Sequence, residues 1–164
     1  MSALFGKKFK LVISNQKRGE TRTWLYPNED GSEGIKATFT ITKTSGLEPN
    51  SLDLVIYDLD KDSRDFVSDR GDHVQVYAGL GSGPAKLIYT GNVIFGQSKR
   101  EGASWYTSLE SGDGYRAYGL STISKTLAPG SSTKDAFVSI LDTLGLSKGI
   151  IKGLPDTLLK QGIT

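Results

Sequence analysis

The chain has 164 residues, of which 37% are hydrophobic and 23% are charged, a composition that excludes a disordered or membrane-spanning protein. Its 20 basic and 18 acidic residues leave a net charge of only +2, which argues against a dedicated nucleic-acid-binding protein. Because the chain has no cysteine, disulfides, thiolate zinc sites and cysteine nucleophiles are excluded.

The N-terminal stretch MSALFGKKFKLVIS has no apolar run long enough for a signal peptide. No other stretch is long and apolar enough to cross a bilayer. We therefore expect a protein that assembles in a cytoplasm and has no membrane partner.

Alternation of apolar and polar residues predicts a mainly β protein with short connections. In chain order, strands are expected at Phe9–Ser14, Glu20–Tyr26, Ile35–Thr42, 52–57, His73–Ala78, Lys86–Gln97 (as one strand or as two interrupted at Gly91-Asn92), 105–110 and Tyr115–Leu120. Roughly seven or eight short strands favour a small antiparallel barrel or a sandwich, and we expect the barrel. Its predicted core comprises Phe39, Ile41, Leu52, Leu54, Ile56, Val74 and Val76.

Two segments break this pattern and predict helices. Acidic residues in the first turn favour a short helix over Asp60–Val67, directly after an internal strand. A C-terminal helix is expected after Ser132 or Thr133 as the N-cap, with Gly145 as the C-cap. Its apolar face comprises Ala136, Phe137, Ile140, Leu141 and Leu144.

The chain is therefore expected to consist of a barrel domain, residues 1–130, and a segment 131–164 that holds the helix and an apolar extension. The extension carries too many apolar residues for a free tail: Ile150, Ile151, Leu154, Leu158 and Leu159. It docks on the barrel, or a partner covers it, or a further downstream domain does.

Several motifs that often carry chemistry have simpler interpretations here. The spacing of Asp58, Asp60 and Asp62 is similar to a calcium loop, but Ser63 stands where that loop needs glycine, which favours a helix start. The segment Gly79–Pro84 precedes a strand and is interpreted as a hairpin loop instead of a phosphate-binding loop. Arg70-Gly71-Asp72 has the composition of a tight turn.

No catalytic constellation emerges from the remaining candidates. His73 is the only histidine, and Glu110 and Asp113 carry no mark of a glycosidase pair. The aromatic residues Trp24, Trp105, Tyr106 and Tyr115 are interpreted as core and rim residues, with a stacking platform for bases or sugars as the alternative. We expect no enzymatic activity, no cofactor and no metal.

Four segments, taken in order, carry a resemblance: FTITKTSGLEPNSLDLVIYDLDKDSRDFV, GDHVQVYAGL, KLIYTGNVIFGQSKREGASWYTSLESGDG and LAPGSSTKDAFVSIL. Together they resemble the N-terminal region of phage baseplate hub proteins over most of residues 5–145. The resemblance implies a small barrel of the tail-tube type with a helix beside it. It also implies a virion protein that forms a homotrimer and joins the six-fold tail tube to the three-fold central spike.

Under this resemblance the helix Asp60–Val67 is an outward feature between neighbouring subunits. The expected interface residues are Lys43, Lys61, Arg64, Arg100, Ile150, Ile151, Leu154 and Leu158. Hub proteins of this family are longer, so the chain is expected to be a fragment or a hub whose other domains are encoded separately.

Two alternatives stay open. The first is a tail-tube or tail-terminator protein on the same fold, in rings of six. The second is a monomeric barrel that binds single-stranded nucleic acid or sugar. No specific nucleic-acid binding is expected of a hub, although DNA can pass through an assembled lumen.

Overall fold

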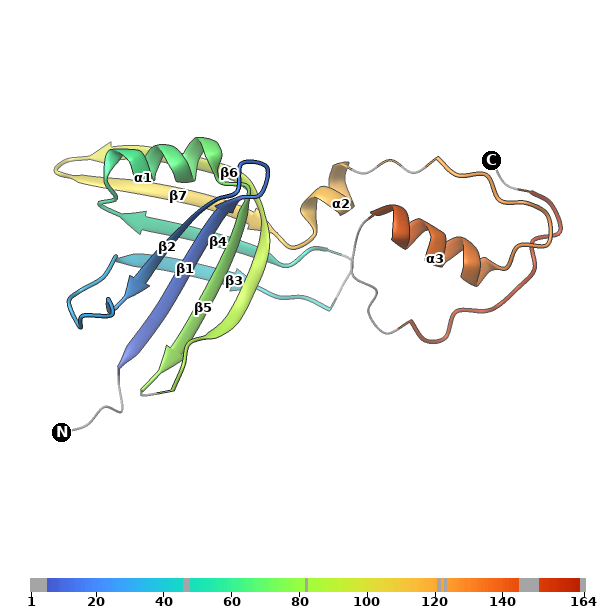
Figure 1. The fold of residues 1–164 in the computed structure, drawn as a ribbon, viewed down its shortest axis with the longest axis horizontal. Coiled ribbons are helices and arrows are strands. Elements are labelled where there is room, and N and C mark those ends of the chain that lie inside the picture. The colour runs from blue at the N-terminus through green and yellow to red at the C-terminus, as the bar shows by residue number, and fades with distance from the viewer. Residues whose placement is uncertain are drawn as a thin grey trace. The chain divides into compact units, whose positions relative to one another are not determined.

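The computed structural model describes residues 6–45, 48–81, 83–120, 122, 124–144 and 151–162. It contains two compact units, Met1–Tyr115 and Arg116–Thr164 (Figure 1). The first unit contains the whole sheet, and the second contains the C-terminal helix.

The first unit is built on one antiparallel sheet of seven strands in the order β2-β1-β5-β6-β7-β4-β3. The strands are β1 (Lys7–Asn15), β2 (Glu20–Tyr26), β3 (Ala37–Thr42), β4 (Ser51–Tyr57), β5 (His73–Leu80), β6 (Lys86–Glu101) and β7 (Ser104–Gly112). No strand pairing joins the edge strands β2 and β3 in the described residues, so the sheet is not closed into the predicted barrel.

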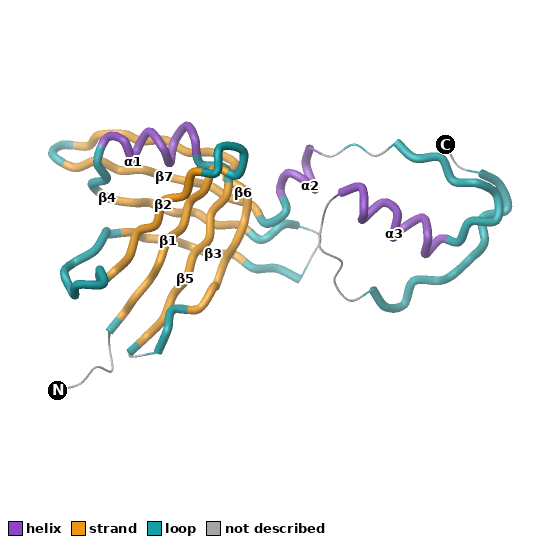
Figure 2. The backbone as a smooth tube through the Cα atoms, viewed as in Figure 1, coloured by secondary structure: helices purple, strands orange, loops and turns teal. Residues whose placement is uncertain are grey.

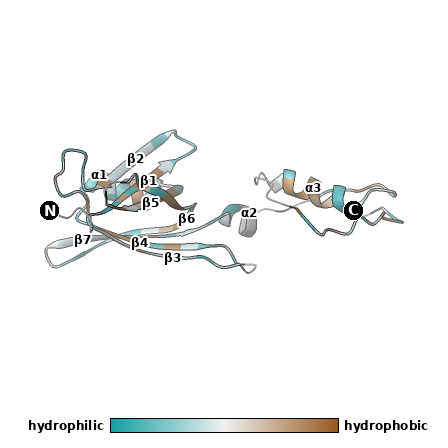
Figure 3. Ribbon diagram, turned by 90° about the horizontal axis from the view of Figure 1, so that it is seen from below, coloured by the Kyte–Doolittle hydropathy of each residue, from teal (hydrophilic) through white to brown (hydrophobic). Residues whose placement is uncertain are grey.

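The long strand β6 folds the sheet over on itself. Its first part pairs with β5 up to Asn92, and its second part pairs with β7 from Asn92 onward. A register shift lies between Val93 and Phe95, next to this change of partner. The sheet therefore forms two layers, β2-β1-β5 and β7-β4-β3, which Figure 3 shows from the side. The segment predicted as one strand, or as two interrupted at Gly91-Asn92, is thus a single strand that belongs to both layers.

The hydrophobic core lies between these two layers. Five of the predicted core residues are buried, namely Leu52, Leu54, Ile56, Val74 and Val76. They are joined by Leu11, Ile13, Leu59, Phe66, Val67, Tyr89 and Leu109. The predicted core residues Phe39 and Ile41 are only partly buried, because their strand β3 is an edge of the open sheet.

The short helix after β4 closes one end of the space between the layers. Helix α1 (Lys61–Asp65) begins after Asp60, whose carboxylate accepts a hydrogen bond from the Ser63 backbone at 3.0 Å. It continues as a π-helical turn, Phe66–Arg70, above β6 and β7 (Figure 2). Phe66 and Val67 are completely buried. The inner face of this helix is thus part of the core, and only its outer face is available to a neighbour.

Gly96 of β6 allows the helical segment to lie directly on the strand. A Cβ atom at this position would lie 2.9 Å from the carbonyl oxygen of Val67 and 3.0 Å from the Cα of Ser68. Since both are backbone atoms, neither can move away without displacing the segment.

One predicted strand is wrong. Tyr115–Leu120 forms helix α2, not a strand. The reason is that β7 has no neighbours beyond Gly112: this residue is paired with Ser51, the first residue of β4, and with Asn92, where β6 leaves to join β5. A strand there would have left its backbone groups without ladder partners.

The second unit contains helix α3 (Thr133–Leu144), as predicted. Ser132 is the N-cap, since its hydroxyl accepts a hydrogen bond from the Asp135 backbone at 3.1 Å. The expected C-cap, Gly145, lies outside the described residues.

The C-terminal extension pairs with the segment that precedes α3, inside its own unit. The Thr133 amide donates to the Thr157 carbonyl, and the Leu159 amide donates to the Ser131 carbonyl, both at 2.9 Å. The extension is therefore held by backbone hydrogen bonds next to the start of α3.

Candidate interaction surfaces

Three of the predicted interface cations gather around Trp105 at the end of the β6–β7 hairpin. The Arg64 guanidinium lies 3.8 Å from the centre of the Trp105 ring. Arg100 is directly opposite Trp105 in the β6–β7 register, so the two side chains share one face of the sheet. Lys61 and Arg64 line a groove of about 390 Å³ between the helical segment and β6, together with Trp105. This cluster is a polar surface with one flat aromatic group.

Each of these cations also has a local partner. Arg64 donates a hydrogen bond to the Leu59 carbonyl at 2.6 Å, and Lys61 pairs with Asp65 at 2.7 Å. Arg100 donates to the Gly102 carbonyl at 3.2 Å. The fourth predicted cation, Lys43, is exposed after β3 and lines a separate hollow of about 190 Å³.

The outer face of the helical segment is linked to β2 by charge. Asp62 forms ion pairs with Arg22 of β2 and with Arg70, the latter at 3.1 Å. The hydrogen bond from Arg22 is the main reason that the pKa of Asp62 lies below its usual value. Both guanidinium groups also lie over the Phe66 ring, 4.9 Å and 5.4 Å from its centre. This arrangement ties the helical segment to the edge strand β2.

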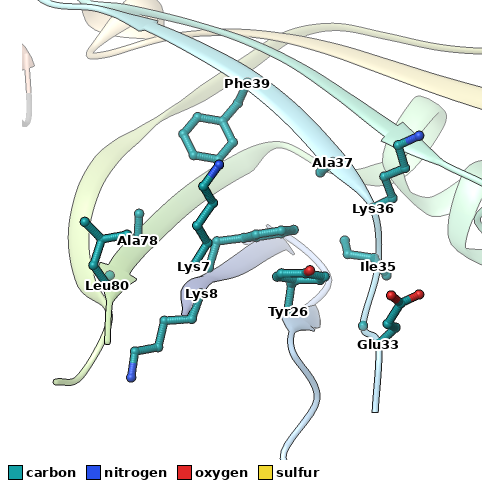
Figure 4. Close-up of a pocket in the computed structure, with 13 residues that line it drawn as sticks. Lys7, Lys8, Tyr26, Glu33, Ile35, Lys36, Ala37, Phe39, Ala78 and Leu80 are labelled. Carbon is teal, nitrogen blue, oxygen red and sulfur yellow. The ribbon is translucent and has the colours of Figure 1, made fainter. Parts of the chain in front are cut away.

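A pocket of about 880 Å³ opens at the other end of the space between the layers. Phe9 stacks on Tyr26 with 5.7 Å between ring centres, and it meets Phe39 edge-on at 6.3 Å. Figure 4 shows the Lys7 side chain extended toward Phe39, while Lys8 points away from it. The remaining lining comes from the segment Glu33–Ala37 and from Ala78, Gly79 and Leu80 of β5.

One hydrogen bond joins the segment that precedes β3 to the edge strand β2 beside this pocket. The Ile35 amide donates to the Leu25 carbonyl at 3.2 Å. Gly34 permits this approach, because a Cβ atom at Gly34 would overlap the carbonyl group of Leu25. In the described part of the chain, β3 itself is paired with β4 on one side and has no strand on its other side.

Large apolar side chains are exposed elsewhere in the first unit. Ile94 and Phe95, at the register shift of β6, are 43% and 49% exposed. Leu80 and Leu87, on either side of the β5–β6 hairpin loop, are 72% and 48% exposed. Sequence reasoning missed these residues, although Val93-Ile94-Phe95 gave a signal: consecutive residues of a strand point to opposite faces, so three apolar ones cannot all face one core.

The predicted apolar interface residues of the extension are placed as follows. Ile151 is half-buried, Leu154 is 36% exposed and Leu158 is 66% exposed. Ile150 lies outside the described residues. In the same unit Phe137 and Ile140 of α3 are also more than one-third exposed. An apolar surface therefore remains on the second unit although its extension is held by hydrogen bonds.

The motifs that were given simpler interpretations have structural roles. The Asp58 carboxylate accepts a hydrogen bond from the Trp105 backbone at 2.9 Å, and Asp60 caps α1. The tight-turn interpretation of Arg70-Gly71-Asp72 is wrong, because Arg70 ends the π-helical turn and Gly71 is extended. Arg70 is engaged by Asp62, and Asp72 is buried, so the tripeptide is not an exposed adhesion loop either. His73 is hydrogen-bonded to Thr90 at 3.0 Å. No group of residues that could hold a metal ion is found in the described ranges.

The four aromatic residues considered as a stacking platform do not share one surface. Trp24 packs against the core from β2. Trp105 and Tyr106 are consecutive on β7, so their side chains point to opposite faces of the sheet. Tyr106 contacts Tyr57 edge-on, with 5.2 Å between ring centres. In the described residues, no helix is long and apolar enough to cross a membrane.

Comparison with known proteins gives a structural likeness without a detectable sequence family. No family model and no curated protein matches the chain. The structure is similar to the 43 kDa tail protein of prophage MuSo2 from Shewanella oneidensis, with a TM-score of 0.57, at 12% identity over 96% of this chain. The chain has the fold of part of a phage tail protein.

Two further tail or virion structures match less closely. A tail protein from Neisseria meningitidis MC58 has a TM-score of 0.48 at 14% identity over 84% of this chain. A chain of the native gene transfer agent virion has a TM-score of 0.43 at 16% identity over 76% of this chain. The chain spans 43% of the Shewanella protein, 34% of the Neisseria protein and 45% of the gene transfer agent chain.

Proposed function

We propose that this protein is a non-enzymatic structural component of a phage tail, acting as a hub or tail-tip protein in the virion. The likeness to the prophage tail protein over 96% of the chain is the observation that carries the proposal. Since similarity of fold does not by itself give function, the surfaces must supply the rest of the argument.

The surfaces fit a protein that works by contact with other subunits. Ile94, Phe95, Leu80 and Leu87 are large apolar groups left in solvent on the isolated chain, as expected for a protein–protein interface. The sheet also ends in two edge strands, β2 and β3, and edge strands readily pair with another chain. In the proposed assembly Ile94, Phe95, Leu87 and the edge of β2 are covered by neighbouring copies, while Leu80 and the edge of β3 are left free.

In this role the protein forms a homotrimer that joins the tail tube to the central spike. The cations around Trp105 (Lys61, Arg64 and Arg100), together with Lys43, lie at the subunit contacts of the sheet unit. The extension and α3 give a second contact through Ile150, Ile151, Leu154 and Leu158. Assembly takes place in the host cytoplasm.

The oligomeric state tests the proposal directly. Native mass spectrometry of the full chain, over a range of protein concentrations, is expected to give a trimer. The double substitution Ile94→Glu/Phe95→Glu should shift it toward monomer, while the matched change Lys17→Glu in the exposed β1–β2 turn should not. A ring of six would favour a tail-tube or tail-terminator protein on the same fold. A chain that stays monomeric, alone and with purified tail particles, would contradict both.

A further inference from the structure

The pocket at the open end of the sheet is large, and the predicted assembly contacts leave it unused. Its volume, about 880 Å³, lies near the upper end of the usual range for ligand pockets. None of the predicted interface residues lines it. No residue of the helical segment is among its lining residues.

The lining gives the pocket an apolar interior. Phe9, Tyr26 and Phe39 form a cluster of aromatic contacts, and Ile35, Ala37 and Ala78 complete the walls. Leu80 stands at the edge with 72% of its surface exposed. An aromatic surface flanked by small side chains accommodates one or two bulky apolar side chains of a ligand.

The rim of the pocket carries an excess of positive charge. Lys7, Lys8 and Lys36 line it, against a single acidic residue, Glu33. In the described part of the chain, Lys7, Lys8 and Glu33 have no ion-pair partner, and the Lys36 ammonium lies over the Tyr57 ring at 4.7 Å. Carboxylates on a ligand would therefore be attracted to this rim.

One wall of the pocket is an edge strand. Ala37 and Phe39 belong to β3, which is paired only with β4 in the described residues. Such an edge offers backbone amide and carbonyl groups that an extended polypeptide can match and a simple hydrocarbon chain cannot. The neighbouring strand edge then selects a peptide among the ligands that an apolar pocket with a basic rim could hold.

From these three features together we propose that this pocket, lined by Phe9, Tyr26, Phe39 and Ala78, binds an extended segment of a different protein. The segment pairs with the edge of β3, places a bulky apolar side chain on the aromatic cluster and presents carboxylates to Lys7 and Lys8. This site is distinct from the proposed subunit contacts, so it holds whether the chain is a monomer, a trimer or a hexamer.

Three probes test the site on the full chain. The first is a fluorescein-labelled hexapeptide in which glutamate alternates with leucine and phenylalanine. The second has lysine in place of each glutamate, and the third is dodecanoate. Fluorescence anisotropy should show saturable binding of the acidic peptide, at least about tenfold tighter than that of the basic peptide. Amide chemical shifts of Ile35, Ala37 and Phe39 should change with the same saturation curve.

Two variants and one matched control separate binding from folding. Lys7→Glu/Lys8→Glu should weaken the acidic peptide about tenfold, while Lys17→Glu/Arg18→Glu, at the opposite end of the β1–β2 hairpin, should change it less than about twofold. Ala78→Trp fills the pocket and should abolish saturable binding, and its circular dichroism melt checks that it still folds.

Each other outcome overturns the proposal. Absence of saturable binding, or equal binding of the acidic and basic peptides, would show that the pocket does not select such a segment. Dodecanoate bound as tightly as the acidic peptide would indicate a site for acyl chains. Shifts at Ile35 and Phe39 that depend only on protein concentration would indicate that a second copy of this chain occupies the pocket.

Discussion

The Arg64 guanidinium lies over the ring of Trp105, 3.8 Å from its centre, and joins the helical segment to strand β7. The same guanidinium donates a hydrogen bond to the Leu59 carbonyl, at the point where β4 leads into α1. The side chain that was expected to serve an interface therefore also holds the local structure together.

Arg64→Ala should lower the free energy of unfolding by about 1 to 2 kcal/mol, because it removes both the ring contact and the hydrogen bond to Leu59. Urea unfolding of the full chain measures this change. Lys61→Ala, which removes only an exposed ion pair with Asp65, is the control and should change stability by less than about 0.5 kcal/mol. Equal effects of the two substitutions would show that the Arg64 contacts contribute little.

Leu54→Asp should destabilise the protein by more than about 3 kcal/mol, because it places a carboxylate in the core between the layers. Leu54 is 2% exposed, whereas the adjacent Asp53 is exposed on the other face of β4. Asp53→Leu is therefore the matched change of opposite sense, and it should leave the unfolding midpoint nearly unchanged. If Leu54→Asp unfolded at the wild-type denaturant concentration, the assigned facing of β4 would be refuted.

Gly96→Ala should destabilise by about 1 to 3 kcal/mol, since the added methyl group meets the backbone of Val67 and Ser68. Gly83→Ala is the control, because a Cβ at Gly83 meets nothing within 4 Å. That control should be neutral or slightly stabilising, as alanine restricts the unfolded chain. The difference between the two melting temperatures measures how closely the helical segment lies on β6.

The ion pairs of Asp62 predict a loss of stability in acid. Its pKa in the folded protein is lowered below the usual value of 3.8, first by the hydrogen bond from Arg22, so the carboxylate form is favoured by folding. This contribution is fully present above the pKa of the unfolded chain and disappears as the pH falls through the folded value.

The measurement is the free energy of unfolding of wild type and Asp62→Asn, followed from about pH 5 down to about pH 2. The wild-type curve should fall more steeply, and the gap between the curves should shrink at high salt. Glu29→Gln, which removes an exposed carboxylate in the β2–β3 loop, controls for the change in net charge. Parallel curves for wild type and Asp62→Asn would contradict the expected linkage.

Much of the sheet could be predicted because its strands have one buried face. In β4, Leu52, Leu54 and Ile56 alternate with polar or half-buried residues, and all three are buried as the alternation predicts. The N-cap at Ser132 could also be predicted from neighbouring residues, because a hydroxyl directly before an amphipathic run can accept a hydrogen bond from one of the first amide groups of the helix. Such signals depend on near neighbours in the sequence.

The errors concern relations between distant segments. No residue within Tyr115–Leu120 indicates that β7 loses both of its neighbouring strands beyond Gly112. The segment predicted as a strand is therefore a helix. The open seam between β2 and β3 was likewise invisible, since Phe39 shows the same alternation in an open sheet as in a closed barrel. The pocket was missed for the same reason.

The surface residues give one example of a relation that the sequence hides and one example of an exposure that it reveals. That Lys61, Arg64 and Arg100 meet around Trp105 follows from the β6–β7 register and the position of α1, which the sequence does not reveal. Exposed Ile94 and Phe95 could have been found, because a run of three apolar residues in a strand must place at least one on the outer face.

The continuity of β6 through both layers has a mechanical consequence. Its 16 residues are hydrogen-bonded to β5 in one layer and to β7 in the other, so a force that separates the layers loads this strand, together with the Ile35–Leu25 hydrogen bond and the Arg22–Asp62 pair. Hydrogen bonds loaded lengthwise share the load and break together, whereas those at a free edge open one at a time. Under a pulling force, β2 or β3 should therefore detach from the sheet first, and β6 should detach last.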